Sequence, residues 1–327
     1  MQNILLVSVN ELVEKNNIIF GPINSRRFGT SLGIDLSPSH KQCNFDCLYC
    51  ELAPMATVDS QTNTVSVKEI IDALKVHLSE KIDVITLTAN GEPTLYPYLD
   101  ELINEINNIK KTTETLILTN SATLINQDVF NSLLKLDQVK LSLDAVSTDV
   151  FKKIDRPHES IKVDDIVQKV KEFSRVYKGK LFIEILFVHG LNDTKEEISK
   201  LNTVLLEIKA QRIDLGTIDR PPAYPVMGVS YKELYEASLE FDSSLPIHIA
   251  SRVHAEPNNA AYSTEEILNT LDKRPLTQDD INLLFDEESK IKLETLKLEH
   301  KVLIKNVGSL EFFIPCENEI RKLKKRA

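Results

Sequence analysis

The sequence lacks the features that mark membrane, secreted or fibrous proteins. Among its 327 residues no apolar run approaches the ~20 residues that a membrane-spanning helix needs. Residues 1–15 lack the basic segment and the cleavage site of a signal peptide. An apolar fraction of 42% and a charged fraction of 27% are ordinary for a soluble globular protein. We therefore expect a cytoplasmic protein that does not associate with membranes.

Basic residues are outnumbered by acidic ones, 39 against 49, which gives a net charge of −10. This balance argues against general adhesion of the surface to nucleic acid. One strongly basic segment, RKLKKR at residues 321–326, stands near the end of the sequence. A solvated tail is the favoured interpretation of this segment, ahead of a tail that contacts RNA or phosphate.

Cysteine is scarce, and its placement is informative. Cys43, Cys47 and Cys50 lie within eight residues, whereas Cys316 is remote, so the four cysteines do not form a disulfide framework. Clustered thiolates bind soft metals and iron–sulfur clusters. Because three ligands cannot close a cubane of four irons, one iron would stay open to another ligand. The spacing alone leaves two alternatives, a zinc knuckle with His40 as fourth ligand and a set of buried structural cysteines.

The cysteine motif, C-x3-C-x-aromatic-C with Tyr49 in the aromatic position, resembles the cluster loop of the radical S-adenosylmethionine (radical SAM) superfamily. The resemblance implies a 4Fe-4S cluster on the three clustered cysteines, with the amino and carboxylate groups of SAM on the open iron. It also implies reductive cleavage of SAM to a 5′-deoxyadenosyl radical that abstracts hydrogen from a substrate. The electron donor expected for such an enzyme is a reduced flavodoxin or ferredoxin.

A pair of arginines, Arg26 and Arg27, precedes the cysteine loop in a glycine-bounded segment. Adjacent guanidinium groups can grip a phosphate or carboxylate, and a surface ion pair is the alternative. The S-R-R-x-G pattern is similar to a group of Fe-S oxidoreductases related to the wyosine-forming tRNA enzymes. The two arginines are therefore candidate substrate contacts.

Strand patterns alternate with helix patterns along the first 250 residues. Each of six apolar strands is followed by a helix-like segment, and such alternation predicts parallel βαβ units with right-handed crossovers. We expect an α/β fold, an open (β/α)6 barrel, which the radical SAM resemblance also implies as a partial TIM barrel. The barrel domain is assigned to residues 1–250 and the cysteine loop to 37–54. The six predicted strands are 32–36, 84–88, 114–119, 139–144, 180–188 and 212–218.

Polar residues stand where these strands end, which is where parallel α/β folds place their sites. Asn90-Gly91-Glu92-Pro93 resembles the family's glycine-glutamate-proline motif, in which the backbone and the glutamate hold the SAM ammonium; a plain turn is the alternative. Asn120 is a candidate for the ribose hydroxyls or a turn residue. Ser142 and Asp144 lie two apart, so a strand would point both to the barrel interior, matching SAM contacts in relatives.

Two further residues are candidate substrate contacts. Glu184 lies within the apolar strand FIEILFV, where an unpaired acid is costly to bury, and a helix-facing or edge position is the alternative. Arg220 belongs to Asp219-Arg220-Pro221-Pro222, a rigid loop that fixes a guanidinium. The related Fe-S oxidoreductases commonly show R-P-P at this place.

A second unit follows a polar connector at 251–262. Residues 263–327 contain two capping boxes, three short helices and two apolar strands around a glycine, a pattern that predicts a winged-helix-like domain. The third helix carries many glutamates, so protein contact or substrate docking is favoured over specific DNA binding.

The scarcity of cysteine also limits the chemistry. Because Cys316 is the only cysteine outside the loop, a second cluster is not expected, and the reaction of the wyosine-forming enzymes, which use one, is not transferred. A dual-cysteine methyl transfer lacks its thiols for the same reason. The favoured function is a radical SAM enzyme acting on an unidentified substrate, with an RNA nucleoside as one candidate. The alternatives are an activase that generates a radical on a partner protein and a non-enzymatic Fe-S or zinc regulator.

Overall fold

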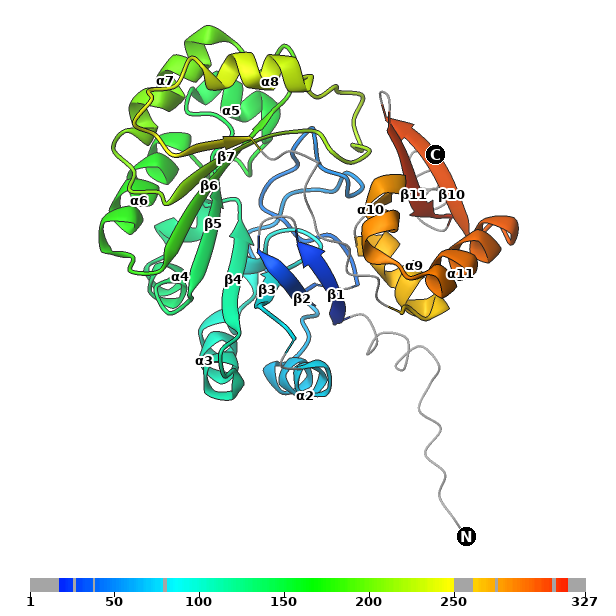
Figure 1. The fold of residues 1–327 in the computed structure, drawn as a ribbon. Helices are drawn as coiled ribbons and strands as arrows, with labels where there is room; N and C mark the ends of the chain where they lie inside the picture. Colours follow the sequence, from blue (N-terminus) through cyan, green and yellow to red (C-terminus); the bar gives the residue numbers. More distant parts are fainter. Residues whose placement is uncertain are drawn as a thin grey trace.

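The protein is built around one curved, mostly parallel sheet of eight strands in the linear order β1 to β8 (Figure 1). Strand β1 pairs antiparallel with β2, and all later neighbours pair in parallel. Within the part of the chain that is described, no helix is both long and apolar enough to cross a bilayer. The computed structural model describes residues 18–25, 28–37, 39–78, 81–249, 261–273, 276–307 and 310–316.

The strands carry apolar residues that face helices on the outer side of the sheet. Their bounds are β1 (Ile19–Ser25), β2 (Gly29–Asp35), β3 (Val84–Thr88), β4 (Glu114–Thr119), β5 (Gln138–Ser142), β6 (Lys180–Phe187), β7 (Arg212–Thr217) and β8 (Ile247–Ile249). The helices of the sheet domain are α2 (Val67–His77), α3 (Leu99–Ile109), α4 (Gln127–Leu133), α5 (Thr148–Ile154), α6 (Val163–Val176), α7 (Lys195–Leu205) and α8 (Tyr231–Ser238). Two short 3-10 turns, η1 (Pro93–Leu95) and η2 (Ala122–Ile125), follow β3 and β4.

Local sequence signals explain where the helices begin and which face they bury. In α2 the Ser66 hydroxyl accepts a hydrogen bond from the Glu69 N–H, and the Glu69 carboxylate accepts one from the Ser66 N–H, which completes a capping box. Ile70 and Leu74 of the same helix are fully buried against the sheet. Burying such side chains stabilises the fold by roughly 1.5–3 kcal/mol each.

The six predicted strands correspond to β2–β7, each followed by a helix, so this part of the prediction is confirmed. Two strands were missed. Strand β1 contains Gly21-Pro22 and an irregular register between Phe20 and Ile23, which breaks the alternating pattern; β8 has only three residues. The prediction also extended the fourth strand to Asp144, whereas β5 ends at Ser142.

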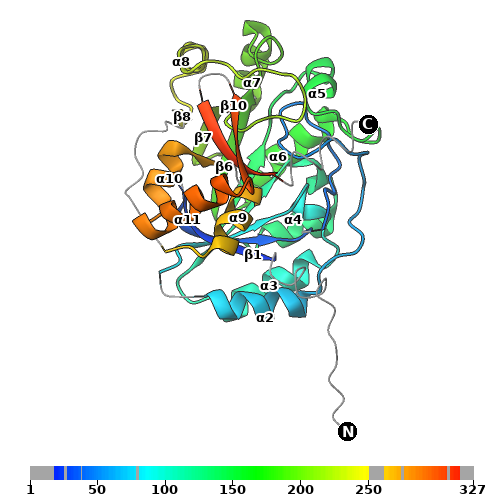
Figure 2. The same cartoon turned by 90° about the vertical axis from the view of Figure 1, so that its right-hand side faces the viewer.

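The C-terminal unit has its own core and packs against β1 (Figure 2). Ile23 of β1 belongs to this second core, and the Tyr262 hydroxyl donates to the Pro22 carbonyl at 2.7 Å. The helices and strands are α9 (Thr264–Lys273), β9 (Leu276–Thr277), α10 (Gln278–Leu284), α11 (Glu287–Leu298), β10 (Val302–Val307) and β11 (Leu310–Pro315), with sheet order β10-β11-β9.

The predicted three helices, capping boxes and strand pair of this unit are present, and the short strand β9 was not expected. Its assignment as a winged helix stays a prediction, as do the domain boundaries. Arg26, Arg27, most of the connector and the basic segment at 321–326 lie outside the described residues.

Candidate active site

The cysteine loop leaves the carboxyl end of β2 and is fixed on one side by the turn that follows β3. The Gln42 N–H donates to the Asn90 carbonyl at 2.7 Å, and the Glu92 N–H donates to the Gln42 carbonyl at 2.9 Å. Gly91 lies between these bonds with φ of +132°, and a Cβ added there would stand 1.9 Å from the Gln42 oxygen. Only glycine permits this close approach of the two backbones.

The opposite side of the cysteine loop is fixed by the segment that ends α5. The Leu48 N–H donates to the Ile154 carbonyl at 2.8 Å, the Asp46 N–H donates to the Asp155 carbonyl at 3.1 Å, and the His158 N–H donates to the Asn44 carbonyl at 2.8 Å. The loop after β7 adds a bond from the Ala223 N–H to the Cys50 carbonyl at 2.8 Å. The three cysteines are thus held between three strand ends, as expected for a site at this edge of a parallel sheet.

The sulfur atoms are surrounded by polar groups of the chain. The Phe45 N–H donates to Cys43 Sγ at 3.4 Å, and the Asn120 amide nitrogen lies 3.8 Å from the same sulfur. The Cys47 thiol donates to Asp155 Oδ1 at 3.5 Å. Among the described residues, no three side chains of His, Cys, Asp or Glu converge on a position for a single metal ion.

The electrostatic environment keeps the free thiols protonated. Burial raises the pKa of Cys43 to about 12, and the nearby Glu92 carboxylate adds to this effect. Burial raises the pKa of Cys47 well above its ordinary value; it also raises that of Cys50, where the Lys41 ammonium opposes it. Thiols of high pKa are poor nucleophiles, but a bound metal removes their protons outright. The donor set therefore suits an iron–sulfur cluster better than nucleophilic catalysis.

Glu92 accepts four hydrogen bonds from its own chain. Its donors are the Thr94 N–H at 3.0 Å and hydroxyl at 2.5 Å, the Thr119 hydroxyl at 2.6 Å and the Asn120 N–H at 2.8 Å. A carboxylate offers about four acceptor sites, so all are occupied. Glu92 therefore braces the ends of β3 and β4, and a SAM ammonium group would have to displace one of these donors. Its neighbour Pro93 begins η1.

Three other predicted cofactor residues lie in the cysteine loop or hydrogen-bond to it. The Tyr49 hydroxyl donates to Asp144 Oδ2 at 2.5 Å, and the Leu186 N–H donates to Asp144 Oδ1 at 2.7 Å. Burial raises the pKa of Asp144 to about 7. The Asn120 amide donates to Asn44 Oδ1 at 2.6 Å. Tyr49 and Asn120 thus connect the cysteine loop to the ends of β5 and β4.

The expectation that Ser142 and Asp144 lie on one strand face is wrong, because β5 ends at Ser142. The Ser142 side chain is half-buried, and its carbonyl accepts a hydrogen bond from the Ser121 hydroxyl at 2.8 Å. Asp144 instead reaches back to the cysteine loop from the segment beyond the strand. The two residues still occupy the same carboxyl edge of the sheet.

The two predicted substrate residues that the structure describes, Glu184 and Arg220, have ion-pair partners. Glu184 pairs with the buried Lys140, which also lies 3.7 Å from Asp214. Its neighbours Ile183 and Ile185 belong to the core on the helix side, so Glu184 faces the inner side of the sheet and the helix-facing alternative is excluded. Arg220 pairs with Glu51, the residue after Cys50, and is therefore brought to the cysteine loop.

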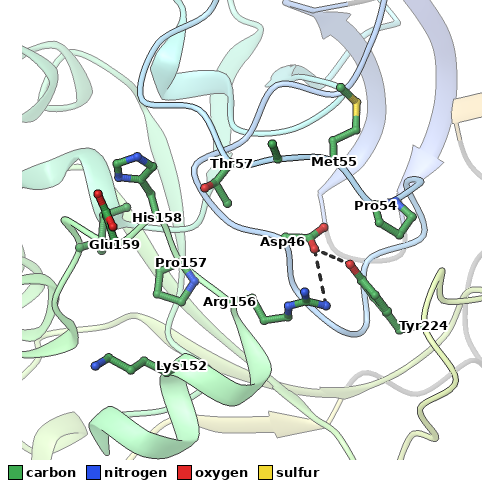
Figure 3. Close-up of a pocket in the computed structure, with 12 residues that line it drawn as sticks. Asp46, Pro54, Met55, Thr57, Lys152, Arg156, Pro157, His158, Glu159 and Tyr224 are labelled. Carbon is green, nitrogen blue, oxygen red and sulfur yellow. Dashed lines mark hydrogen bonds and ion pairs between the residues drawn. The ribbon is translucent and has the colours of Figure 1, made fainter. Parts of the chain in front are cut away.

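Sequence reasoning missed a group of charged and aromatic residues around Asp46 (Figure 3). The buried Asp46 carboxylate lies 3.1 Å from the Lys41 ammonium and 3.6 Å from the Arg156 guanidinium, and it accepts a hydrogen bond from the Tyr224 hydroxyl. The position of Asp46 between two cysteines could have identified it. Nothing in the sequence connects it to Arg156 or Tyr224, which lie more than 100 residues away.

Comparisons with known proteins find a family model, relatives in sequence and solved structures of similar fold. The model of the Radical SAM superfamily matches residues 38–201. A UPF0026 protein of Helicobacter pylori (strain ATCC 700392 / 26695) is 38% identical over 304 residues, which cover 92% of this chain and 98% of that protein. TYW1 with a lysine-pyruvate adduct bound has a similar fold, with TM-score 0.51 and 18% identity over 67% of this chain and 76% of that chain. Streptococcus suis SuiB bound to S-adenosylmethionine also has a similar fold, with TM-score 0.52 and 19% identity over 80% of this chain and 56% of that chain.

Proposed function

The chain belongs to the radical SAM superfamily and, within it, to the UPF0026 family, and on this premise we propose that it is an enzyme with one 4Fe-4S cluster and a SAM site. Cys43, Cys47 and Cys50 would hold the cluster. The observation that carries the proposal is the cysteine loop itself, which holds three half-buried thiols and is fixed against the Gly91 turn. When bound and reduced, such a cluster would supply the electron for cleavage of SAM to a 5′-deoxyadenosyl radical, which would abstract hydrogen from the substrate.

Residues at the ends of β3, β4 and β5 would position SAM. The turn at Gly91 brings its backbone against Gln42, the residue before Cys43, and so would fix the first cluster ligand beside the end of β3. The Asn120 amide nitrogen lies 3.8 Å from Cys43 Sγ and is suited to a polar contact with the nucleoside. Tyr49 and Asp144 would fix the loop around the cofactor, and Ser142 offers a half-buried hydroxyl at the same edge.

Anaerobic reconstitution of the full chain with iron and sulfide tests this proposal directly. We expect about four irons per chain, as in a 4Fe-4S protein, and release of 5′-deoxyadenosine from SAM after reduction with dithionite. The expectation rests on the three thiols, which need metal charge to ionise at neutral pH. A chain that takes up one zinc ion in place of iron, and leaves SAM intact, would contradict it.

For the substrate we propose a nucleoside in tRNA, supported by the S-R-R-x-G resemblance of the segment before the cysteine loop. The expected result is that total tRNA from a strain lacking this protein has lost one modified nucleoside or accumulated its precursor. Liquid chromatography with mass spectrometry of the digested tRNA measures this difference, and restoring the gene provides the control. An unchanged nucleoside profile would shift the assignment to a partner protein or a small molecule.

A further inference from the structure

A network of charged side chains crosses β5, β6, β7 and β8 on the inner side of the sheet, which faces away from the helices (Figure 1). Along each strand its members alternate with residues that belong to the helix-side core or pack against it. Glu184, Asp214 and His248 form one row, because their positions pair in register across β6, β7 and β8. Lys140 of β5 reaches the same row.

Asp214 is the centre of this network, and its side chain is completely buried. The Arg212 guanidinium donates a hydrogen bond to Asp214 Oδ2 at 3.2 Å, and the Lys140 ammonium lies 3.7 Å from the same oxygen. Two cations therefore fix the position of the carboxylate. A buried ionic network often adds no net stability compared with apolar residues, so stability does not explain why these strands carry it.

His248 offers a basic nitrogen at one end of the row. Its Nδ1 lies 3.1 Å from Asp214 Oδ1, and because a carboxylate only accepts hydrogen bonds, Nδ1 carries the proton of the neutral ring. Nε2 then has a free electron pair. Within the described part of the chain Nε2 has no hydrogen-bond partner, and 48% of the side chain is exposed. A histidine that is oriented by a buried aspartate and has its second nitrogen open is suited to act as a general base.

The network begins beside the segment that fixes the cysteine loop. The Leu143 N–H donates to the Glu184 carbonyl at 2.9 Å. The next residue, Asp144, accepts hydrogen bonds from the Leu186 N–H at 2.7 Å and from the Tyr49 hydroxyl at 2.5 Å. A chain of contacts therefore connects the cysteine loop, through β5 and β6, with the charged row on the inner side of the sheet.

We propose that His248 accepts a proton from the substrate and that Asp214 is the positioning residue for its ring. The inference rests on the proposed function. The substrate would carry an O–H or N–H group on the carbon that loses hydrogen, as the hydroxyl-bearing carbons of a ribose do. Loss of hydrogen from such a carbon makes the attached group a stronger acid, so a base beside it speeds the reaction.

The proton transfer involves no change in oxidation state. The O–H or N–H bond of the substrate breaks, its electron pair stays on the oxygen or nitrogen, and a new bond joins the proton to His248 Nε2. The Asp214 carboxylate stabilises the imidazolium that results, because it lies 3.1 Å from the other ring nitrogen. The exposed part of the ring then returns the proton to water.

Rescue by imidazole tests whether His248 acts as a base. With the reconstituted chain, SAM and dithionite, His248→Ala is expected to convert tRNA from the deletion strain at least about 100-fold more slowly than the wild type does. Added imidazole should restore part of the rate, because the side chain is half exposed on the edge strand β8 and a small base can enter its place. Mass spectrometry of the digested nucleosides measures both rates.

His189→Ala is the matched control. The His189 side chain is 49% exposed and its Nδ1 lies 3.5 Å from Asp193, but it follows β6 in a turn and also approaches Glu233 of α8. This variant should convert tRNA as the wild type does, with or without imidazole. Equal loss in both variants, or a loss in His248→Ala that imidazole does not restore, would overturn the proposal.

The protonation of the His248 ring in the wild type gives a test that needs no substrate. In the full chain labelled with ¹⁵N-histidine, nuclear magnetic resonance should show the neutral ring with a proton on Nδ1 and none on Nε2. The signal that is absent from His248→Gln identifies the residue. A proton on Nε2 would overturn the proposal. A wild type that leaves every tRNA nucleoside unchanged would instead refute the tRNA substrate of the proposed function, and the ring protonation would still decide this inference.

Discussion

The Cys47→Ala variant is expected to be a folded chain that holds no 4Fe-4S cluster after reconstitution and does not cleave SAM. Cys47 is half-buried beside the end of α5, and its sulfur contacts Asp155 at 3.5 Å. With this thiol removed, two ligands remain, and two cannot hold a cubane that already has one open iron. Iron and sulfide analysis, visible absorbance and the yield of 5′-deoxyadenosine measure the loss.

Cys316→Ala is the matched control because it also removes one half-buried thiol. Cys316 follows β11 in the C-terminal unit, where its N–H donates to the Lys301 carbonyl at 2.8 Å. This variant should keep about four irons per chain, as in a 4Fe-4S protein. The metal-free Cys47→Ala chain should unfold within about 3 kcal/mol of the wild type, since it loses one buried hydrogen bond. A Cys47→Ala chain with full iron content would remove Cys47 from the ligand set.

The alternation of strands and helices in the sheet domain could be predicted, because each central strand is a short apolar run and the helices follow recognisable start signals. Strand β3, VITLT, and the capping box at Ser66 are examples in which local preference and tertiary packing agree. The two edge strands have weak local strand signals. Strand β1 is interrupted by Gly21-Pro22, and β8 is only three residues long. Both are stabilised as strands by pairing with a neighbour, β1 with β2 and β8 with β7.

Of the candidate site, the sequence predicted the residues that lie in motifs. Cys43, Cys47, Cys50 and Tyr49 share one short segment, and their proximity follows from chain connectivity. Glu92 was placed correctly at a strand end, but its role could not be judged, because its four donors come from η1, the last residue of β4 and the residue after it. Side-chain pairing of this kind depends on the strand register, which the sequence does not display.

The contacts that link distant segments were beyond sequence reasoning. Asp155 lies 108 residues from Cys47, and Tyr224 lies 178 residues from Asp46. Burial raises the pKa of Asp144, Asp155 and Glu92, which all lie near the cysteine loop, and nearby negative charge adds to this effect for Asp144 and Asp155. The three thiols of the loop, whose pKa values are all raised, need a nearby cation in order to ionise, which is an electrostatic demand for one. That demand supports a metal cluster as the resident group of this site.

Replacing Gly91 with alanine is expected to prevent cluster assembly although all three cysteines remain. The added Cβ would stand 1.9 Å from the Gln42 oxygen and 2.4 Å from its carbonyl carbon, so the two backbones must separate. That movement breaks the bonds from Gln42 N–H to Asn90 and from Glu92 N–H to Gln42, next to Cys43. Lost hydrogen bonds and strain together should lower the free energy of unfolding by on the order of 4 kcal/mol.

Gly190→Ala separates the collision from the backbone strain. Gly190 also has a positive φ, +72°, but a Cβ there would meet nothing within 4 Å. It should cost only about 1–2 kcal/mol, the usual penalty of a left-handed alanine, and should leave iron content and SAM cleavage at wild-type values. Chemical unfolding of both metal-free variants, followed by iron analysis after reconstitution, makes the comparison. If Gly91→Ala took up iron as well as Gly190→Ala, the contact between the Gly91 turn and the cysteine loop would not be what holds the cluster ligands in place.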